Sequence, residues 1–109
     1  MQTVVELPEF VRRAQQLLSE GEIQLLVSYL AEFPQAGALI EGTGGVRKVR
    51  WARDGMGKRG GVRVIYYFHS ERMPLYLLTV FGKNEKADLS MAERVALAKF
   101  VKRLVNAAR

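Results

Sequence analysis

The sequence predicts a single α+β domain, residues 1–109, in which an antiparallel sheet carries a pair of helices on one face. Two observations lead to this fold class. Apolar residues recur at helical spacing in the first third of the chain, and the period changes to two after a glycine-rich stretch at 42–45. Three consecutive strands joined by short turns then follow, which is typical of an antiparallel meander. The length of 109 residues, with 49% of them hydrophobic, suits one modest core.

The first part of the chain is predicted to be a strand followed by a helical hairpin. Residues 3–7 form the strand, and Pro8 stands at the first position of a helix, where its missing N–H costs least. Ser19 and Glu22 have the spacing of a capping box, so a second helix begins there. Pro34 ends that helix.

The second part is predicted to be three strands and a terminal helix, which gives the order βααβββα. The expected segments are a loop at 37–45, a strand containing residues 48–51, a Gly-rich turn at 54–60, and strands at 62–69 and 75–81. Ser90 and Glu93 form a second capping box, which starts an amphipathic helix. The helical hairpin is expected to cover one face of the sheet, so that the other face carries the basic side chains of the strands.

The charge of the chain is unevenly distributed. The net charge is +6, yet the first 45 residues carry two arginines against six glutamates, so the basic excess lies entirely in the remainder. A concentrated positive patch on a small domain favours a polyanion such as nucleic acid, although a cationic face can also serve solubility alone. Cysteine is absent, which excludes disulfides and thiolate metal sites and fits a cytoplasmic protein. No apolar run is long enough for a membrane span, and no secretory leader is expected.

Basic side chains on the predicted meander are the main functional signal. Lys48 and Arg50 are two residues apart on a strand and therefore share a face, opposite to Val49 and Trp51. Arg63 begins the next strand and can approach them across the sheet. Three convergent cations would bind a phosphate, and an arginine can do so through two hydrogen bonds. A sheet face that is merely protected by charge is the alternative interpretation.

Two further basic segments lie beside this face. Lys58 and Arg59 belong to a Gly-rich loop whose backbone can approach phosphate closely, or which is simply a hairpin turn. The segment 83–86 follows the last meander strand and offers a candidate acid or base, or a plain surface turn. His69 is the only histidine, which excludes a two-histidine nuclease, and the carboxylates show no magnesium-ligand spacing.

Three segments in order, 42–48, 57–67 and 77–85, resemble the RelE superfamily of toxins from bacterial toxin–antitoxin pairs, most closely members of the HigB type. The matching stretches read GTGGVRK, GKRGGVRVIYY and LLTVFGKNE, and the strand order corresponds over almost the whole chain. The resemblance implies a RelE-like fold and a cytoplasmic toxin that enters the ribosomal A site and cleaves messenger RNA without a metal or cofactor. The expected partners are therefore the cognate antitoxin, the ribosome and messenger RNA.

The resemblance also assigns roles to residues. The catalytic group carried over from the family pattern is Lys48, Arg50, Arg63 and Lys83. RNA binding is predicted for the neighbouring residues Arg47, Lys58, Arg59, Asn84, Glu85 and Lys86. This chain departs from the family pattern at Asn84, where an arginine is common, and it has no C-terminal tyrosine. The general acid and base are therefore left open.

Two other functions are compatible with the same sequence. A ParE-like toxin shares the fold but poisons DNA gyrase, and such relatives usually lack a basic sheet face. A nucleic-acid-binding module without catalysis would leave RNA intact. The four cations assigned above favour the nuclease.

Overall fold

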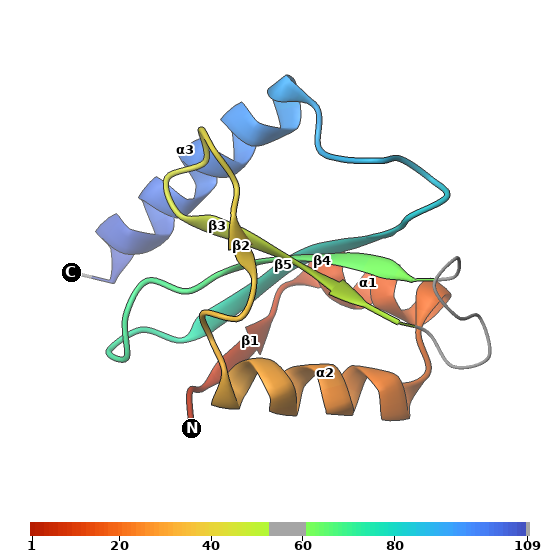
Figure 1. The fold of residues 1–109 in the computed structure, drawn as a ribbon. Helices are drawn as coiled ribbons and strands as arrows, with labels where there is room; N and C mark the ends of the chain where they lie inside the picture. Colours follow the sequence, from red (N-terminus) through yellow and green to blue (C-terminus); the bar gives the residue numbers. More distant parts are fainter. Residues whose placement is uncertain (53–60, 109) are drawn as a thin grey trace.

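The computed structural model of the chain describes residues 1–52 and 61–108. Figure 1 shows a central twisted sheet with helices on both sides. In chain order the elements are β1 (Val4–Glu6), α1 (Pro8–Leu17), α2 (Glu20–Glu32), β2 (Ala38–Leu39), β3 (Val46–Trp51), β4 (Val62–Tyr67), β5 (Leu75–Gly82) and α3 (Met91–Ala107). The predicted α+β class is confirmed. Within the described residues, no helix combines the length and the apolar content needed to cross a membrane.

The sheet has the strand order β1-β5-β4-β3-β2. The meander of β3, β4 and β5 is antiparallel, as predicted. The two edge strands lie beyond the predicted meander: no place in the sheet was predicted for the strand at 3–7, and a loop was expected at 37–45. Strand β1 lies parallel to β5, because the helical hairpin carries the chain back before the meander begins. Strand β2 lies inside the predicted loop and pairs with β3, and the Ile40 N–H extends the pairing with a 2.8 Å hydrogen bond to the Val46 carbonyl oxygen.

The helices begin where the sequence signals predicted. Pro8 stands in the first turn of α1. Ser19 and Ser90 cap α2 and α3, and each accepts a 3.1 Å hydrogen bond from the backbone N–H of the glutamate three residues later. Glu22 and Glu93 return the interaction to the serine N–H groups at 2.8 Å. Both predicted capping boxes are therefore confirmed.

Each face of the sheet has its own apolar core. On one face α1 and α2 bury Phe10, Leu26 and Leu30 against alternate residues of the strands. On the other face α3 packs Val101 over a second cluster, which includes Ile65. Figure 1 shows α3 and α2 on opposite sides of the sheet. The prediction that the helical hairpin covers only one face is confirmed, and α3 occupies part of the other.

The Gly-Thr-Gly-Gly segment forms a tight turn between β2 and β3. Gly42, Gly44 and Gly45 have φ values of 80°, 74° and 116°, which favour glycine. Thr43 is fully buried, and its hydroxyl donates to the Ile40 carbonyl at 2.6 Å and accepts from the Val46 N–H at 3.1 Å. This turn therefore fixes the start of β3, the strand that carries Lys48 and Arg50.

Candidate active site

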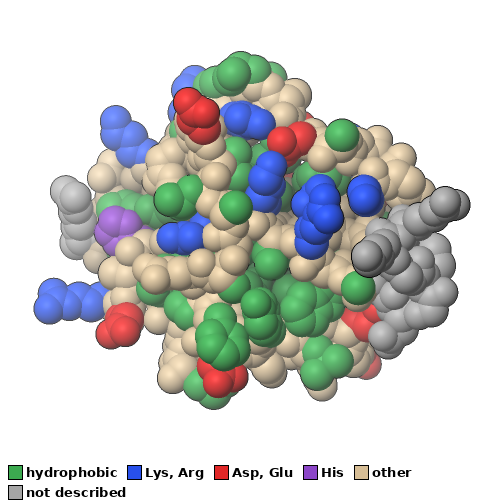
Figure 2. All heavy atoms as spheres, viewed as in Figure 1, with side chains coloured by type: hydrophobic (Ala, Val, Ile, Leu, Met, Phe, Trp, Pro, Cys, Tyr) green, Lys and Arg blue, Asp and Glu red, His purple; other side chains and the backbone are tan. Residues whose placement is uncertain are grey.

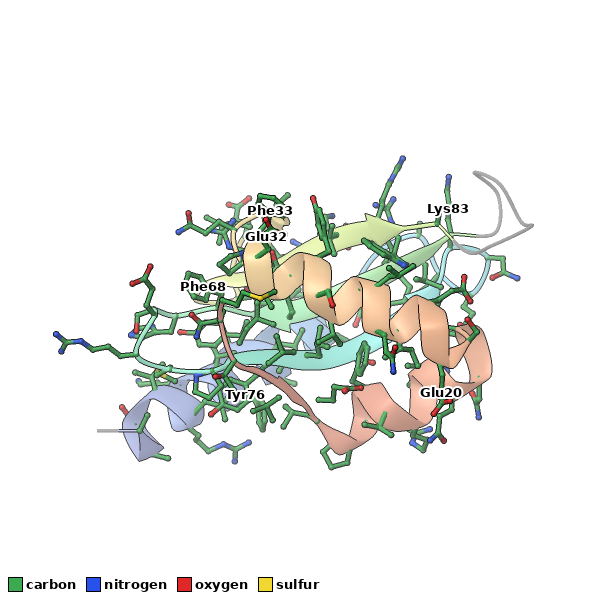
Figure 3. The ribbon with its side chains drawn as sticks, turned by 90° about the horizontal axis from the view of Figure 1, so that it is seen from below. Glu20, Glu32, Phe33, Phe68, Tyr76 and Lys83 are labelled. Atoms are coloured by element: carbon green, nitrogen blue, oxygen red, sulfur yellow. The ribbon has the colours of Figure 1, made fainter. Side chains whose placement is uncertain are left out.

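A cavity of about 290 Å³ opens where β3 ends, β4 begins and β5 ends. Its lining consists of Arg50, Trp51, Ala52, Gly61, Val62, Arg63 and Lys83. We call this the cationic pocket. It brings together three of the four residues to which the sequence assigned catalysis. Lys83 lies at this end of the sheet, away from Phe68 and Tyr76 at the opposite end (Figure 3).

The register of the strands explains how the cations meet. Arg50 of β3 lies directly opposite Arg63 of β4, so both side chains leave the same face of the sheet. The Lys83 N–H donates a 3.1 Å hydrogen bond to the Gly61 carbonyl oxygen, which places that lysine beside the start of β4. Within residues 1–52 and 61–108, none of the three side chains forms an ion pair. Like charges placed opposite each other destabilise a sheet, so this arrangement favours a bound anion.

Lys48 shares the face of Arg50 but turns toward α3. Its Nζ lies 3.1 Å from Oδ2 of Asp88, which is also 3.3 Å from an Arg94 guanidinium nitrogen. The Leu89 N–H donates to the other Asp88 oxygen at 2.8 Å, and this hydrogen bond, together with that of Lys48, lowers the pKa of Asp88. Lys48 is therefore held beside the cationic pocket and does not line it. This contact of Asp88 with Lys48 was not predicted from the sequence.

The segment after β5 is a turn with its own structural partners. Glu85 lies 2.5 Å from an Arg13 guanidinium nitrogen and accepts a 2.8 Å hydrogen bond from the Gly82 N–H. Lys86 forms an ion pair with Glu93, and its Nζ lies 4.9 Å above the Phe81 ring. These contacts hold the turn that carries Lys83. RNA binding by Glu85 and Lys86 stays a prediction, and so does RNA binding by the exposed Asn84.

Arg47 lies on the opposite face of β3 from Lys48 and Arg50. Its guanidinium donates to the carbonyl oxygens of Gly37 at 2.7 Å and Gln35 at 3.3 Å, and it therefore supports the connection between α2 and β2. The structure does not bring it to the cationic pocket. The other two predicted RNA-binding residues, Lys58 and Arg59, lie outside the described residues.

The Glu85 contacts give a prediction on acid stability. The hydrogen bond from Arg13 is the largest cause of the lowered pKa of Glu85, so the folded protein keeps this carboxylate charged where the unfolded chain already protonates it. Its contribution is present above the ordinary pKa of 4.5 and is lost as pH falls through the lowered value. We expect the Glu85→Gln substitution to lower the free energy of unfolding by about 1 kcal/mol at pH 7, as for the loss of a partly exposed ion pair.

The measurement for Glu85→Gln is urea unfolding between pH 7 and pH 3. The difference in the free energy of unfolding between variant and wild type should become smaller as the pH falls below 4.5, because Glu85 of the wild type then loses its charge. Glu9→Gln is the matched control, since the ion pair of Glu9 with Arg12 is more exposed and longer, at 3.8 Å. If this difference does not change with pH, the charge of Glu85 does not stabilise the fold.

The fold and the cationic pocket define a class of protein: a small α+β domain whose sheet ends in a pocket that Arg50, Arg63 and Lys83 line. The family model described as the RelE toxin of the RelE / RelB toxin-antitoxin system matches residues 10–109. The chain therefore belongs to the RelE toxin family, and is the toxin component of a toxin–antitoxin pair. The predicted recognition at the level of this family is confirmed, whereas the HigB type stays a prediction.

Proposed function

We propose that this toxin is an endoribonuclease that cleaves messenger RNA in the A site of the ribosome and so inhibits translation. The observation that carries the proposal is the meeting of Arg50, Arg63 and Lys83 in one pocket, without an ion-pair partner among the described residues. Three such cations suit the scissile phosphate of a nucleic acid better than a solvated surface, because register partners of like charge repel each other when nothing lies between them.

The proposed reaction uses the RNA itself as nucleophile and no metal or cofactor. The 2′-oxygen attacks the adjacent phosphorus, the bond from phosphorus to the 5′-oxygen breaks, and the products are a 2′,3′-cyclic phosphate and a 5′-hydroxyl. A base takes the proton of the 2′-hydroxyl, and an acid protonates the leaving 5′-oxygen. Arg50 and Arg63 would bind the non-bridging oxygens and stabilise the charge that builds up on the phosphorane. Lys83 and the nearby Lys48 are the candidate proton carriers.

Dependence on the ribosome is part of this proposal. Among residues 1–52 and 61–108, those that line the cationic pocket include no carboxylate, histidine or tyrosine. His69 belongs to the other end of β4, where its Nδ1 lies 3.1 Å from the Tyr67 hydroxyl. The described pocket therefore supplies electrostatic stabilisation but an incomplete set of acid and base groups. We infer that the ribosome contributes by holding the RNA in a reactive geometry, which can account for a large share of a rate enhancement.

The test compares one messenger RNA free in solution and engaged in a ribosome. We expect the purified toxin to cleave the ribosome-bound RNA at the A-site codon and to leave 2′,3′-cyclic phosphate ends, whereas free RNA stays almost intact. Mapping of 5′ ends and treatment with a cyclic-phosphate-specific enzyme provide the readout. Equal rates on free and bound RNA would contradict the proposal. A ParE-like gyrase inhibitor or a non-catalytic binding module would leave both RNAs uncut.

The proposed partners follow from the same argument. Membership of the toxin family implies an antitoxin partner. The ribosome and messenger RNA are proposed as the targets, and the cytoplasm as the compartment where they are met. Expression of the toxin without its antitoxin should consequently arrest bacterial growth.

A further inference from the structure

Arg13 of α1 reaches the edge of the sheet beside the turn that carries Lys83. Its Nε donates a 3.1 Å hydrogen bond to the Val80 carbonyl oxygen, and a terminal guanidinium nitrogen lies 2.5 Å from Oε2 of Glu85. In Figure 3 α1 lies at the same end of the sheet as Lys83. Val80 precedes Lys83 and Glu85 follows it. Arg13 therefore connects a core helix to the chain on both sides of this lysine.

The edge of β5 explains why a side chain is needed here. Strand β1 pairs with β5 only from Leu75 to Leu77, so among the described residues the last part of β5 has no strand on that side. Side chains take the place of the strand. Arg13 donates to the Val80 carbonyl oxygen, and the Glu85 carboxylate accepts from the N–H of the last β5 residue at 2.8 Å. These two backbone groups would otherwise have to bond to water.

The Glu85 carboxylate passes this support on to Lys83. Its Oε1 accepts from the Gly82 N–H, and the Glu85 N–H donates to the Gly82 carbonyl oxygen at 2.9 Å, which closes the turn. Glycine suits this contact, because a Cβ at position 82 would lie 3.2 Å from Oε1 of Glu85. On its other side the Lys83 N–H is bonded to the Gly61 carbonyl oxygen. The backbone of Lys83 is thus fixed between β4 and the ion pair of Glu85 with Arg13.

Electrostatic repulsion makes this support necessary. Lys83 lines the cationic pocket with Arg50 and Arg63, and among the described residues it forms no ion pair of its own. Figure 2 shows further Lys and Arg side chains gathered over the sheet. Like charges in one pocket repel each other, which favours displacement of the exposed turn. The hydrogen bond from Arg13 lowers the pKa of Glu85, so the ion pair that opposes this displacement is charged at neutral pH.

We propose that Arg13, acting through Glu85, is a positioning residue that places the Lys83 ammonium group in the cationic pocket for proton transfer. The proposal rests on the proposed function, in which Lys83 is a candidate proton carrier. Neither Arg13 nor Glu85 lines the pocket, so they act through the turn and do not touch the RNA phosphate. Both carboxylate oxygens of Glu85 are engaged by the toxin itself, and a negative charge repels a polyanion, which favours positioning over RNA binding for this residue.

The expected effect follows from the geometry that proton transfer requires. A proton carrier must lie within hydrogen-bond reach of the reacting oxygen. A displacement of about 1 Å can cost on the order of 100-fold in rate, even when the substituted residue is remote from the reacting atoms. Loss of Arg13 should therefore lower the maximal rate and leave the affinity for the ribosome unchanged.

The test is single-turnover cleavage of a programmed ribosome over a range of toxin concentrations. We expect Arg13→Ala to lower the maximal rate about 10- to 100-fold without changing the half-saturating concentration. In a Lys83→Ala background the same substitution should have no further effect, since no ammonium group is left to place. Arg12→Ala is the matched control, because Arg12 is the neighbouring arginine on α1, forms an exposed ion pair of 3.8 Å with Glu9, and should keep the wild-type rate.

Two further variants test the link itself. Arg13→Lys keeps a cation beside Glu85 but loses the planar guanidinium, and we expect an intermediate rate. Glu85→Gln removes the same ion pair at its other end and should show a loss of the same kind. Glu85→Gln also serves if Arg13→Ala does not fold, and circular dichroism decides which variants are compared.

A second readout does not depend on cleavage. The NMR signals of the Lys83 backbone amide and ammonium group should shift in Arg13→Ala and stay in place in Arg12→Ala. A folded Arg13→Ala protein with the wild-type maximal rate would overturn the proposal. So would Lys83 signals that do not move, or an equal loss of rate with and without Lys83, which would make Arg13 purely structural. A wild-type toxin that cleaves no RNA would instead contradict the proposed function, and the NMR comparison alone would then decide whether Arg13 places Lys83.

Discussion

Arg63→Ala is expected to lower the rate of ribosome-dependent cleavage by about 10²–10³-fold, the cost of losing one preorganised transition-state donor. Arg63 faces Arg50 across β3 and β4 and lines the cationic pocket together with Lys83. Its guanidinium stays charged at every working pH and can bind two phosphate oxygens at once. These interactions strengthen as charge develops on the phosphorane, so the loss should appear mainly in kcat.

The measurement is single-turnover cleavage of a programmed ribosome by Arg63→Ala, Arg63→Lys and wild type. The lysine variant keeps the charge but not the paired hydrogen bonds, and we expect an intermediate rate. Arg72→Ala is the control, because Arg72 is an exposed arginine in the turn between β4 and β5, at the other end of the strands. A folded Arg63→Ala protein with the wild-type rate would remove Arg63 from the site and weaken the assignment of the pocket.

The sequence predicted the parts of the fold that are set by local interactions. A capping box forms between a serine and a glutamate three residues later, within a single turn of the chain. Both capping boxes were therefore predicted correctly. The alternation along 48–51 likewise placed Lys48 and Arg50 on one face, as observed. The same alternation puts Arg47 on the opposite face, where it binds the Gly37 carbonyl oxygen, and RNA binding by Arg47 stays a prediction.

The features that the sequence did not predict depend on contacts between distant segments. A strand of three residues such as β1 does not indicate which edge it joins. The two residues of β2 pair with β3 across a turn in which Thr43 is hydrogen-bonded to both sides. The ion pairs of Asp88 and Glu85 span 40 and 72 residues. Both carboxylates come from an irregular segment, where no periodicity indicates the direction of a side chain.

The assignment of the site combined three residues that line one pocket with two residues of β3, Arg47 and Lys48, that do not. Arg50, Arg63 and Lys83 meet in the cationic pocket because register fixes the first two and the β5 turn fixes the third. The exposed aromatic residues of α2 were not recognised as a surface. The helical spacing of Leu25, Tyr29 and Phe33 was visible in the sequence, but their exposure depends on which stripe of α2 faces the sheet.

Two phenylalanines differ sharply in burial, and they give a matched test of what holds the fold together. Phe10 of α1 is fully buried in the core beneath the sheet, whereas Phe33 is exposed at 50% at the end of α2. We expect Phe10→Ala to lower the free energy of unfolding by about 3–5 kcal/mol, because it removes apolar contacts and leaves a cavity. This is a large share of the roughly 5–15 kcal/mol that holds a typical domain folded.

The measurement is urea unfolding of Phe10→Ala and Phe33→Ala beside the wild type, followed by fluorescence of Trp51. Phe33→Ala, the same chemical change at an exposed position, should stay within about 0.5 kcal/mol of the wild type. Equal unfolding midpoints for the two variants would mean that Phe10 does not support the core that positions β5, and with it the turn that carries Lys83.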